Sequence, residues 1–147
     1  MTSRLTEGLS FEWRAERHVE ELLARLSVED LPAEQAARLA ELAASAGARR
    51  SRLERRLQAL RTAPFLAPMP QPIDRLDEAL EAALALTRAS ADRYAALAEL
   101  SRRLADPESA FACELNRIAA EEAAILLDGM LATAVDDTLH RLSLIHI

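Results

Sequence analysis

The sequence contains few of the residues that mark several common classes of protein. It has three glycines, five aromatic residues and no lysine among its eighteen basic residues in 147 residues. Its single cysteine, Cys113, excludes an internal disulfide and is typical of a reducing compartment. Phosphate-binding glycine loops, nucleophile elbows and paired-cysteine motifs are absent, so the sequence gives no support to the enzyme classes that use them.

Long hydrophobic runs are also absent. No apolar run near the start resembles a signal peptide, and none reaches the roughly 18 residues that a membrane helix needs. We therefore expect a soluble, cytoplasmic protein without a membrane partner. The net charge of −6 argues against a general binder of polyanions, so nucleic acid is not an expected partner.

Residues that favour helices dominate the sequence. Alanine occurs 31 times and leucine 26 times, and the length suits one domain with a core of its own. Apolar residues recur at helical spacing in segments of about 5–27, 33–61, 73–104 and 107–139. This pattern predicts an all-α, single-domain protein of four helices within residues 1–141.

Each predicted helix has one polar residue on its inward line. These residues are Glu12, Arg49, Thr87 and Glu122. On the fourth helix the predicted inward line is Phe111, Leu115, Ile118, Glu122, Ile125 and Gly129.

The connections predict the topology. Residues 27–32 and 106–107 are short breaks and therefore join helical hairpins, whereas residues 63–72 contain four prolines and span about 30 Å if they adopt polyproline geometry. Such a segment is long enough for a crossover between parallel neighbours in an antiparallel bundle. Folding each hairpin about its turn would bring Glu12 beside Arg49 and Thr87 beside Ile125.

This layout resembles the ferritin-like superfamily, and most closely its rubrerythrin-type branch. The most specific part is residues 86–126, LTRASADRYAALAELSRRLADPESAFACELNRIAAEEAAIL. The resemblance implies a di-metal site in which each half of the bundle supplies a Glu and a Glu-x-x-His motif. The corresponding positions of this sequence are Glu12, Ala46, Arg49, Thr87, Glu122 and Ile125.

Only two of these six implied ligands are carboxylates, and no histidine is present among them. We therefore expect no cofactor, with iron or manganese as the alternative. The hypothesis for the core is that Arg49 replaces the metal charge by pairing with Glu12 and with Glu122. The alternative is that Arg49 reaches solvent and Glu122 lies at the edge of its stripe.

The resulting prediction of function is a structural or protein-interaction module that has lost its metal site, with a homodimer or another protein as partner. The alternative is a di-iron or di-manganese oxidase, peroxidase or iron store with an unusual ligand set. A third hypothesis is a basic patch that binds nucleic acid through Arg49, Arg50, Arg52, Arg55, Arg56 and Arg61, for which we prefer neutralisation within the first hairpin. No exposed apolar stripe is evident from which to name a partner face.

Four further residues are interpreted without a functional role. Tyr94 is expected to fill the core, Cys113 to be a buried inert thiol, and His18 and His140 to be solvated. Residues 142–147 (LSLIHI) match the translation of a transposon-based sequencing adapter, so we expect them to be a library-derived tail that replaces the natural C-terminus. The alternative is a genuine apolar tail.

Overall fold

A computed structural model describes residues 3–26, 31–64, 68 and 70–145. Four helices account for most of them: α1 (Arg4–Ala24), α2 (Ala33–Ala59), α3 (Leu76–Arg103) and α4 (Pro107–Ile145). No strand occurs in these described ranges, so the all-α prediction is confirmed. The predicted breaks at 27–30 and the crossover residues 65–67 and 69 lie outside them.

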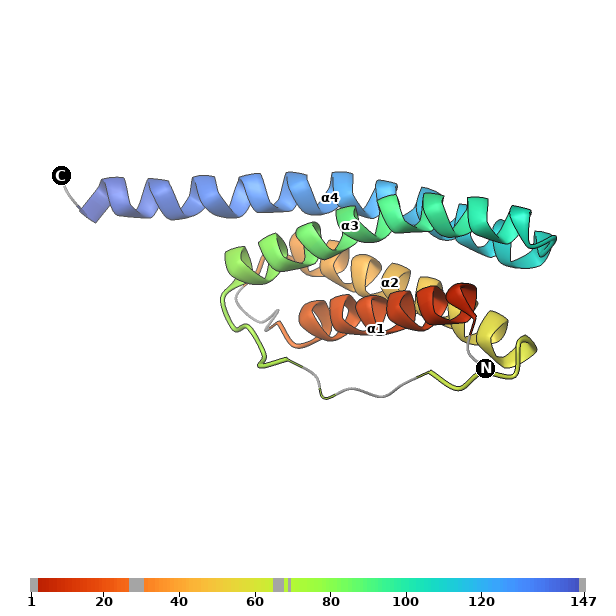
Figure 1. Cartoon of the computed structure of the whole chain (residues 1–147). Coiled ribbons are helices and arrows are strands. Elements are labelled where there is room, and N and C mark those ends of the chain that lie inside the picture. Colours follow the sequence, from red (N-terminus) through yellow and green to blue (C-terminus); the bar gives the residue numbers. More distant parts are fainter. Residues whose placement is uncertain (1–2, 27–30, 65–67, 69, 146–147) are drawn as a thin grey trace.

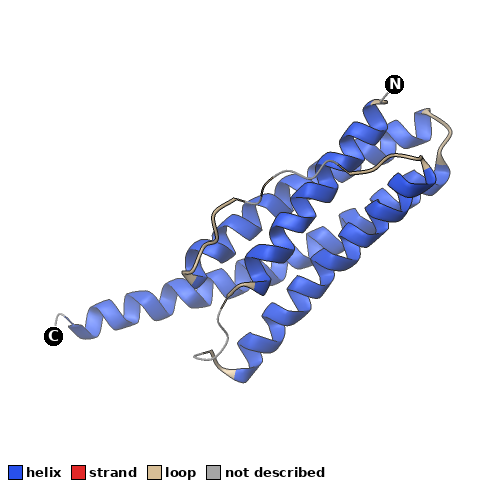
Figure 2. Ribbon diagram, turned by 90° about the horizontal axis from the view of Figure 1, so that it is seen from below, coloured by secondary structure: helices blue, strands red, loops and turns tan. Residues whose placement is uncertain are grey.

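The helices form a bundle of two antiparallel hairpins (Figure 1; Figure 2). α1 packs against α2 and α3 packs against α4, while α1–α3 and α2–α4 contacts join the two hairpins. The two remaining pairs, α1–α4 and α2–α3, lie diagonally and make no contact within the described residues. The expectation that the crossover joins neighbouring helices is therefore wrong, because α2 and α3 occupy opposite corners.

The described part of the crossover follows the surface of α1. Pro68 and Pro70 lie against a groove that begins at Phe11, and the segment reaches Ile73 beside the end of α1 at Arg25. Residues 68 and 70–73 thus lie along α1 between Phe11 and Arg25 before α3 begins (Figure 1). This path returns the chain to the end of the bundle from which α2 started.

Local hydrogen bonds fix where the helices begin and end. The Ser3 hydroxyl accepts from the Thr6 amide at 3.1 Å and caps α1. The residues just beyond the C-caps of α2 and α3, Arg61 (57°) and Ala105 (55°), have positive φ and are followed by 6→1 hydrogen bonds from the Thr62 and Asp106 amides. The second of these ends places Asp106 directly before Pro107, which opens α4.

α4 is longer than predicted and extends beyond the other helices at its C-terminal end (Figure 1). It continues to Ile145 rather than ending near residue 139. The helix therefore includes the described part of the suspected tail, whereas residues 146–147 lie outside the described residues. None of the helices as described is long and apolar enough to cross a membrane.

Buried apolar side chains form two clusters, one toward each end of the bundle. One contains Val19, Leu42 and Leu84, and the other contains Leu9 and Leu53. Between them along α1, α2 and α3 lie buried polar side chains, namely Glu12, Glu16, Arg49, Thr87 and Ser90. The core therefore has a polar layer near its middle.

The predicted inward face of α4 is wrong. Phe111 is 66% exposed and Ile125 is 73% exposed, while Glu122 and Gly129 are also exposed. The buried face instead consists mainly of smaller residues: Ser109, Ala112, Cys113, Asn116, Ala120, Ala123, Leu127 and Met130. Short side chains allow α4 to approach its neighbours closely, so the stripe of larger apolar residues turns outward.

Candidate functional site

The six positions implied by the family resemblance do not come together. Glu12, Ala46, Arg49 and Thr87 are buried in the bundle, whereas Glu122 and Ile125 lie on its outer surface. The error follows directly from the rotation of α4, because both outward residues come from that helix. Their interpretation as vestigial metal-site positions stays a prediction.

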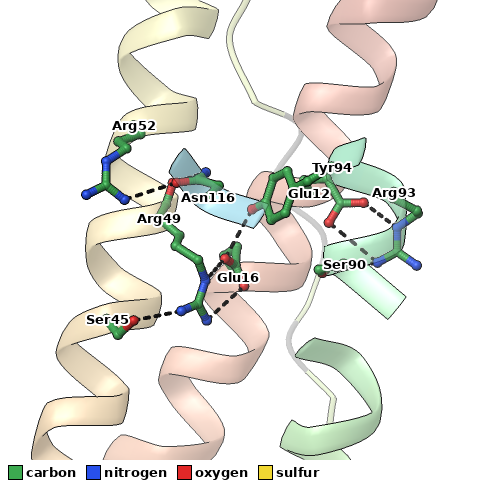
Figure 3. Close-up of polar contacts among 9 residues, drawn as sticks. All are labelled: Glu12, Glu16, Ser45, Arg49, Arg52, Ser90, Arg93, Tyr94 and Asn116. Atoms are coloured by element: carbon green, nitrogen blue, oxygen red, sulfur yellow. Dashed lines mark hydrogen bonds and ion pairs between the residues drawn. The ribbon is translucent and has the colours of Figure 1, made fainter. Parts of the chain in front are cut away.

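The centre of the polar layer is an ion pair between Arg49 of α2 and Glu16 of α1 (Figure 3). The Arg49 Nε donates to Glu16 Oε2, and Nη2 donates to Glu16 Oε1 at 3.3 Å. The two side chains are 1% and 0% exposed. Such a forked, fully desolvated arrangement is the geometry in which a guanidinium binds a carboxylate best.

Neighbouring hydroxyls complete this pair. Ser45 accepts from Arg49 Nη1 at 2.7 Å, and the Tyr94 hydroxyl of α3 donates to Glu16 Oε2 at 3.1 Å (Figure 3). A buried charge is tolerated only when its remaining donors and acceptors are also satisfied. The Glu16 carboxylate therefore links three helices, α1, α2 and α3.

Glu12 has a different cationic partner. Arg93 of α3 donates through Nε to Glu12 Oε1 and through Nη2 to Glu12 Oε2 at 3.4 Å, and it also donates to Ser90 at 3.2 Å. Arg93 is 38% exposed, and its guanidinium carbon lies 4.8 Å from the Phe11 ring centroid. Arg93 thus enters the core from the edge between α1 and α3 (Figure 3).

The predicted core pairing of Arg49 with Glu12 and Glu122 is therefore wrong. Glu16 lies one helical turn after Glu12 on the inward face of α1, at the position that faces Arg49 of α2. Arg49 therefore pairs with Glu16 and not with Glu12. Glu122 cannot take part because it is exposed. The alternative that Arg49 reaches solvent is also excluded, since its side chain is 1% exposed.

Asn116 extends the network to α4. Its Nδ2 donates to the Arg49 carbonyl oxygen at 3.1 Å, and its Oδ1 accepts from Arg52 at 3.1 Å. Sequence reasoning missed Glu16, Arg93 and Asn116. For Glu16 and Asn116 the available signal was helical spacing. Glu16 is four residues after Glu12, and Asn116 lies on the line of small residues of α4 that is buried.

Burial dominates the electrostatics of this layer. It raises the pKa of Glu12, although hydrogen bonds from Arg93 and Ser90 oppose the change. It also raises the pKa of Glu16, against the opposing charge of Arg49 and the hydrogen bonds from Arg49 and Tyr94. The pKa of Tyr94 lies well above its usual range, first because of burial and then because of the nearby Glu16 carboxylate.

Two buried polar atoms have no hydrogen-bond partner in the described part of the structure. These are Trp13 Nε1 and Thr87 Oγ1. Thr87 is the position where the family resemblance implies a carboxylate ligand. A neutral hydroxyl there supplies no charge to a cation.

The donor set of the polar layer does not fit a di-metal centre. Its two carboxylates, Glu12 and Glu16, are each held by a guanidinium, and the layer contains no imidazole. Within residues 3–26, 31–64, 68 and 70–145, no group of three or more His, Cys, Asp and Glu side chains could hold a metal ion. A fixed cation already bound to each of these acids opposes the binding of a dication.

The other residues singled out in the sequence have ordinary surroundings. Tyr94 and Cys113 are buried as expected, and burial raises the pKa of the Cys113 thiol to about 12. His140 is exposed, whereas His18 is half-buried and burial lowers its pKa.

The arginine run on α2 is only partly neutralised within the first hairpin. Arg49 and Arg50 pair with Glu16 and Glu20 of α1. Arg56 instead pairs with Asp106 and Glu108 at the start of the fourth helix, and Arg52 donates to Asn116. The run therefore also ties α2 to α4, which the sequence alone did not indicate.

Comparison with known proteins identifies the fold. No family profile and no curated protein sequence matches the chain. A solved structure from Xanthomonas campestris matches with a TM-score of 0.81 and 20% identity, covering 95% of this chain and 96% of that chain.

Two bacterioferritin structures are also similar. The Mycobacterium tuberculosis protein matches with a TM-score of 0.77 and 18% identity, covering 92% of this chain and 89% of that chain. A mycobacterial bacterioferritin matches with a TM-score of 0.78 and 18% identity, covering 95% and 91%. The chain therefore has the ferritin-like four-helix fold that the sequence resemblance predicted.

Proposed function

We propose that this protein is a ferritin-like bundle without a di-metal centre, and that it acts as a structural or protein-interaction module. The observation that carries the proposal is the Arg49 guanidinium, which is buried against Glu16 in the middle of the bundle. A permanent cation in this position supplies the charge that a metal ion would otherwise give to the carboxylates. The rubrerythrin-type affinity of the sequence remains part of this proposal.

The charges of the layer support the same interpretation. Two carboxylates, Glu12 and Glu16, are balanced by two guanidinium groups, Arg93 and Arg49. A divalent cation bound by Glu16 would have to displace Arg49, which would leave a buried positive charge without its carboxylate partner. The proposed protein is cytoplasmic, in keeping with its single buried thiol.

Metal quantitation on the purified protein tests the proposal. Protein produced with excess iron and manganese, and then exchanged into metal-free buffer, should retain less than about 0.1 ion per chain, since the layer lacks the ligands that such ions prefer. The expected near-ultraviolet spectrum has no ligand-to-iron band. Retention of about two ions per chain would contradict the proposal and favour the oxidase, peroxidase or iron-storage alternative.

A variant control separates a core site from adventitious binding. Glu16→Gln removes one of the two carboxylates of the layer, whereas Glu34→Gln changes an exposed carboxylate of α2. If the wild-type protein holds metal and only Glu16→Gln lowers it, the core binds the ions and the proposal is wrong. Equal and trace values for all three proteins are the expected result.

A further inference from the structure

An apolar stripe runs along the outer face of α4. Phe111 and Ile125 are the most exposed of its members, and Leu115, Ile118 and Leu126 are 36%, 46% and 44% exposed. Leu115, Ile118 and Ile125 follow Phe111 at intervals of four, three and seven residues, and Leu126 is adjacent to Ile125, which places them on one side of the helix. Contiguous apolar faces of this kind are typical of interfaces with another protein.

The two most exposed residues of the stripe lie symmetrically about Ile118. Phe111 precedes Ile118 by seven residues and Ile125 follows it by seven. If a second α4 lay antiparallel on this face with the two-fold axis at Ile118, the Phe111 of each copy would meet the Ile125 of the other. A face that matches itself under a two-fold rotation is the requirement for a closed dimer.

Charged side chains beside the stripe have the same symmetry. Arg55 of α2 lines a shallow groove with Phe111 and Leu115, at the N-terminal half of the stripe. Glu122 lies toward its C-terminal half, four residues after Ile118. Neither side chain forms an ion pair in the part of the chain that the structure describes, and both are exposed. The antiparallel arrangement brings each Arg55 next to the Glu122 of the other copy.

The size of the face also points to an interface that includes α2. From Phe111 to Ile125 the helix rises about 21 Å, and a single helix stripe of that length is smaller than the roughly 800 Å² per partner that stable complexes bury. The edge of α2 that carries Arg52 and Arg55 adjoins the stripe and enlarges the contact. A stripe with this flank suits a second bundle better than a short peptide.

We infer that two copies of this chain associate through the outer faces of their α4 helices, antiparallel about Ile118, with Arg55 of each copy paired to Glu122 of the other. The inference rests on the interaction role in the proposed function and is independent of the state of the core. Ile118 is the centre of the contact, where the two chains bury the same side chain against itself.

Sedimentation equilibrium with matched variants tests the face. Wild-type protein should dimerise at concentrations up to about 100 µM, where dimers with micromolar Kd are populated. Ile118→Glu should raise the dimer Kd more than about tenfold, since it places two like charges at the centre of the contact. Leu104→Glu, which changes a 54% exposed leucine in the turn before α4, should leave the Kd within about twofold. Circular dichroism should show all three proteins to be folded.

A charge exchange tests the antiparallel arrangement. Arg55→Glu and Glu122→Arg should each raise the Kd about three- to tenfold by placing like charges together. The double variant should restore the Kd to within about threefold of wild type, because the pair is then re-formed with opposite signs. Ile118→Cys should also give a disulfide-linked dimer on oxidation, while the buried Cys113 of the wild-type chain should not.

Three results would overturn the inference: a wild-type chain that stays monomeric, an equal effect of Ile118→Glu and Leu104→Glu, or a double charge variant that is no better than the single ones. In the first case another partner or none covers the face. A metal-free monomer would refute the dimer and leave the proposed core intact. A metal-loaded dimer with the predicted variant effects would refute the proposed metal-free core and leave the inferred dimer intact.

Discussion

Arg49 is the side chain whose removal should disturb the core most. Replacing it with Met leaves the Glu16 carboxylate buried without its cation, so we expect a loss of about 3–5 kcal/mol in the free energy of unfolding near pH 8. Urea denaturation measures this loss. Arg38→Met, which removes an exposed pair with Glu34, should cost less than about 1 kcal/mol.

The cost of Arg49→Met should also depend on pH. Burial already raises the pKa of Glu16 above the ordinary value of 4.5, so the folded state binds a proton more tightly than the unfolded state. Stability from this group is complete below pH 4.5 and declines as the pH rises through the folded pKa. The charge and hydrogen bond of Arg49 lower the pKa of Glu16, so removing Arg49 raises that pKa further and favours the neutral carboxyl group, which needs no cationic partner. The penalty should therefore shrink at pH 5, and Glu16→Gln combined with Arg49→Met should recover most of it.

Tyr94 offers a direct optical report on the same layer. It is the only tyrosine in the sequence, and its pKa is held well above 10.0 by burial and by Glu16. Because the unfolded state releases this proton first, the contribution of Tyr94 to stability is present below pH 10 and is lost as the pH rises. Ultraviolet absorbance should show the phenolate only when circular dichroism reports unfolding. A reversible titration near pH 10 in folded protein would contradict the buried hydrogen bond from Tyr94 to Glu16. The Tyr94→Phe variant, which has no tyrosine, provides the absorbance baseline.

The polar layer also shows what sequence can predict at single positions. The inward location of Glu12, Arg49 and Thr87 follows from helical spacing and is confirmed by their burial. The pairing is not predictable in the same way, because Glu12 and Glu16 are one turn apart and the long guanidinium side chain can reach either. Only the packed structure selects Glu16 for Arg49 and brings Arg93 to Glu12.

At the scale of the helices, most large apolar side chains of α1, α2 and α3 are buried, with Phe11 as an exception, whereas most of those of α4 are exposed. Leu9, Leu53 and Leu80 are large and fully buried, so the hydrophobic pattern identifies the inward faces of their helices. In α4 the larger residues form the outer stripe, and alanines such as Ala120 pack inward. A pattern based on side-chain size cannot tell a core face from an interface face, because both exclude water.

The glycines of α1 and α4 allow a matched test of helix packing. A Cβ at Gly129 would have no heavy atom within 4 Å, so Gly129→Ala should stabilise the protein by about 1 kcal/mol through helix propensity. A Cβ at Gly8 would instead clash with Leu97 Cδ2. Because Leu97 is buried, Gly8→Ala must shift a packed side chain and should lose the whole gain or destabilise the protein. Equal gains in urea denaturation would contradict the close approach of α1 and α3.

For the whole molecule, each element contributes differently to the core and to the surface. α1, α2 and α3 supply the charged side chains of the polar layer, while α4 supplies one amide to it and keeps its larger apolar residues outside. The network that replaces metal ligands in our proposal is therefore separate from the face proposed for association. A substitution in the core network should therefore leave dimer formation measurable, and a substitution on the α4 face should leave the core network measurable.

The proposed association predicts that thermal stability depends on protein concentration. Folded dimers are favoured by mass action, so the unfolding midpoint of the wild-type protein should rise as its concentration is increased a hundredfold. Ile118→Glu should remove this dependence, because it opposes the two-fold contact while lying on the exposed side of α4. Arg49→Met should lower the midpoint at every concentration and keep the slope, since it weakens the core of each chain and not the contact between chains. A midpoint that is independent of concentration in all three proteins would mean that the folded chain is a monomer and that the stripe on α4 does not bind a second copy.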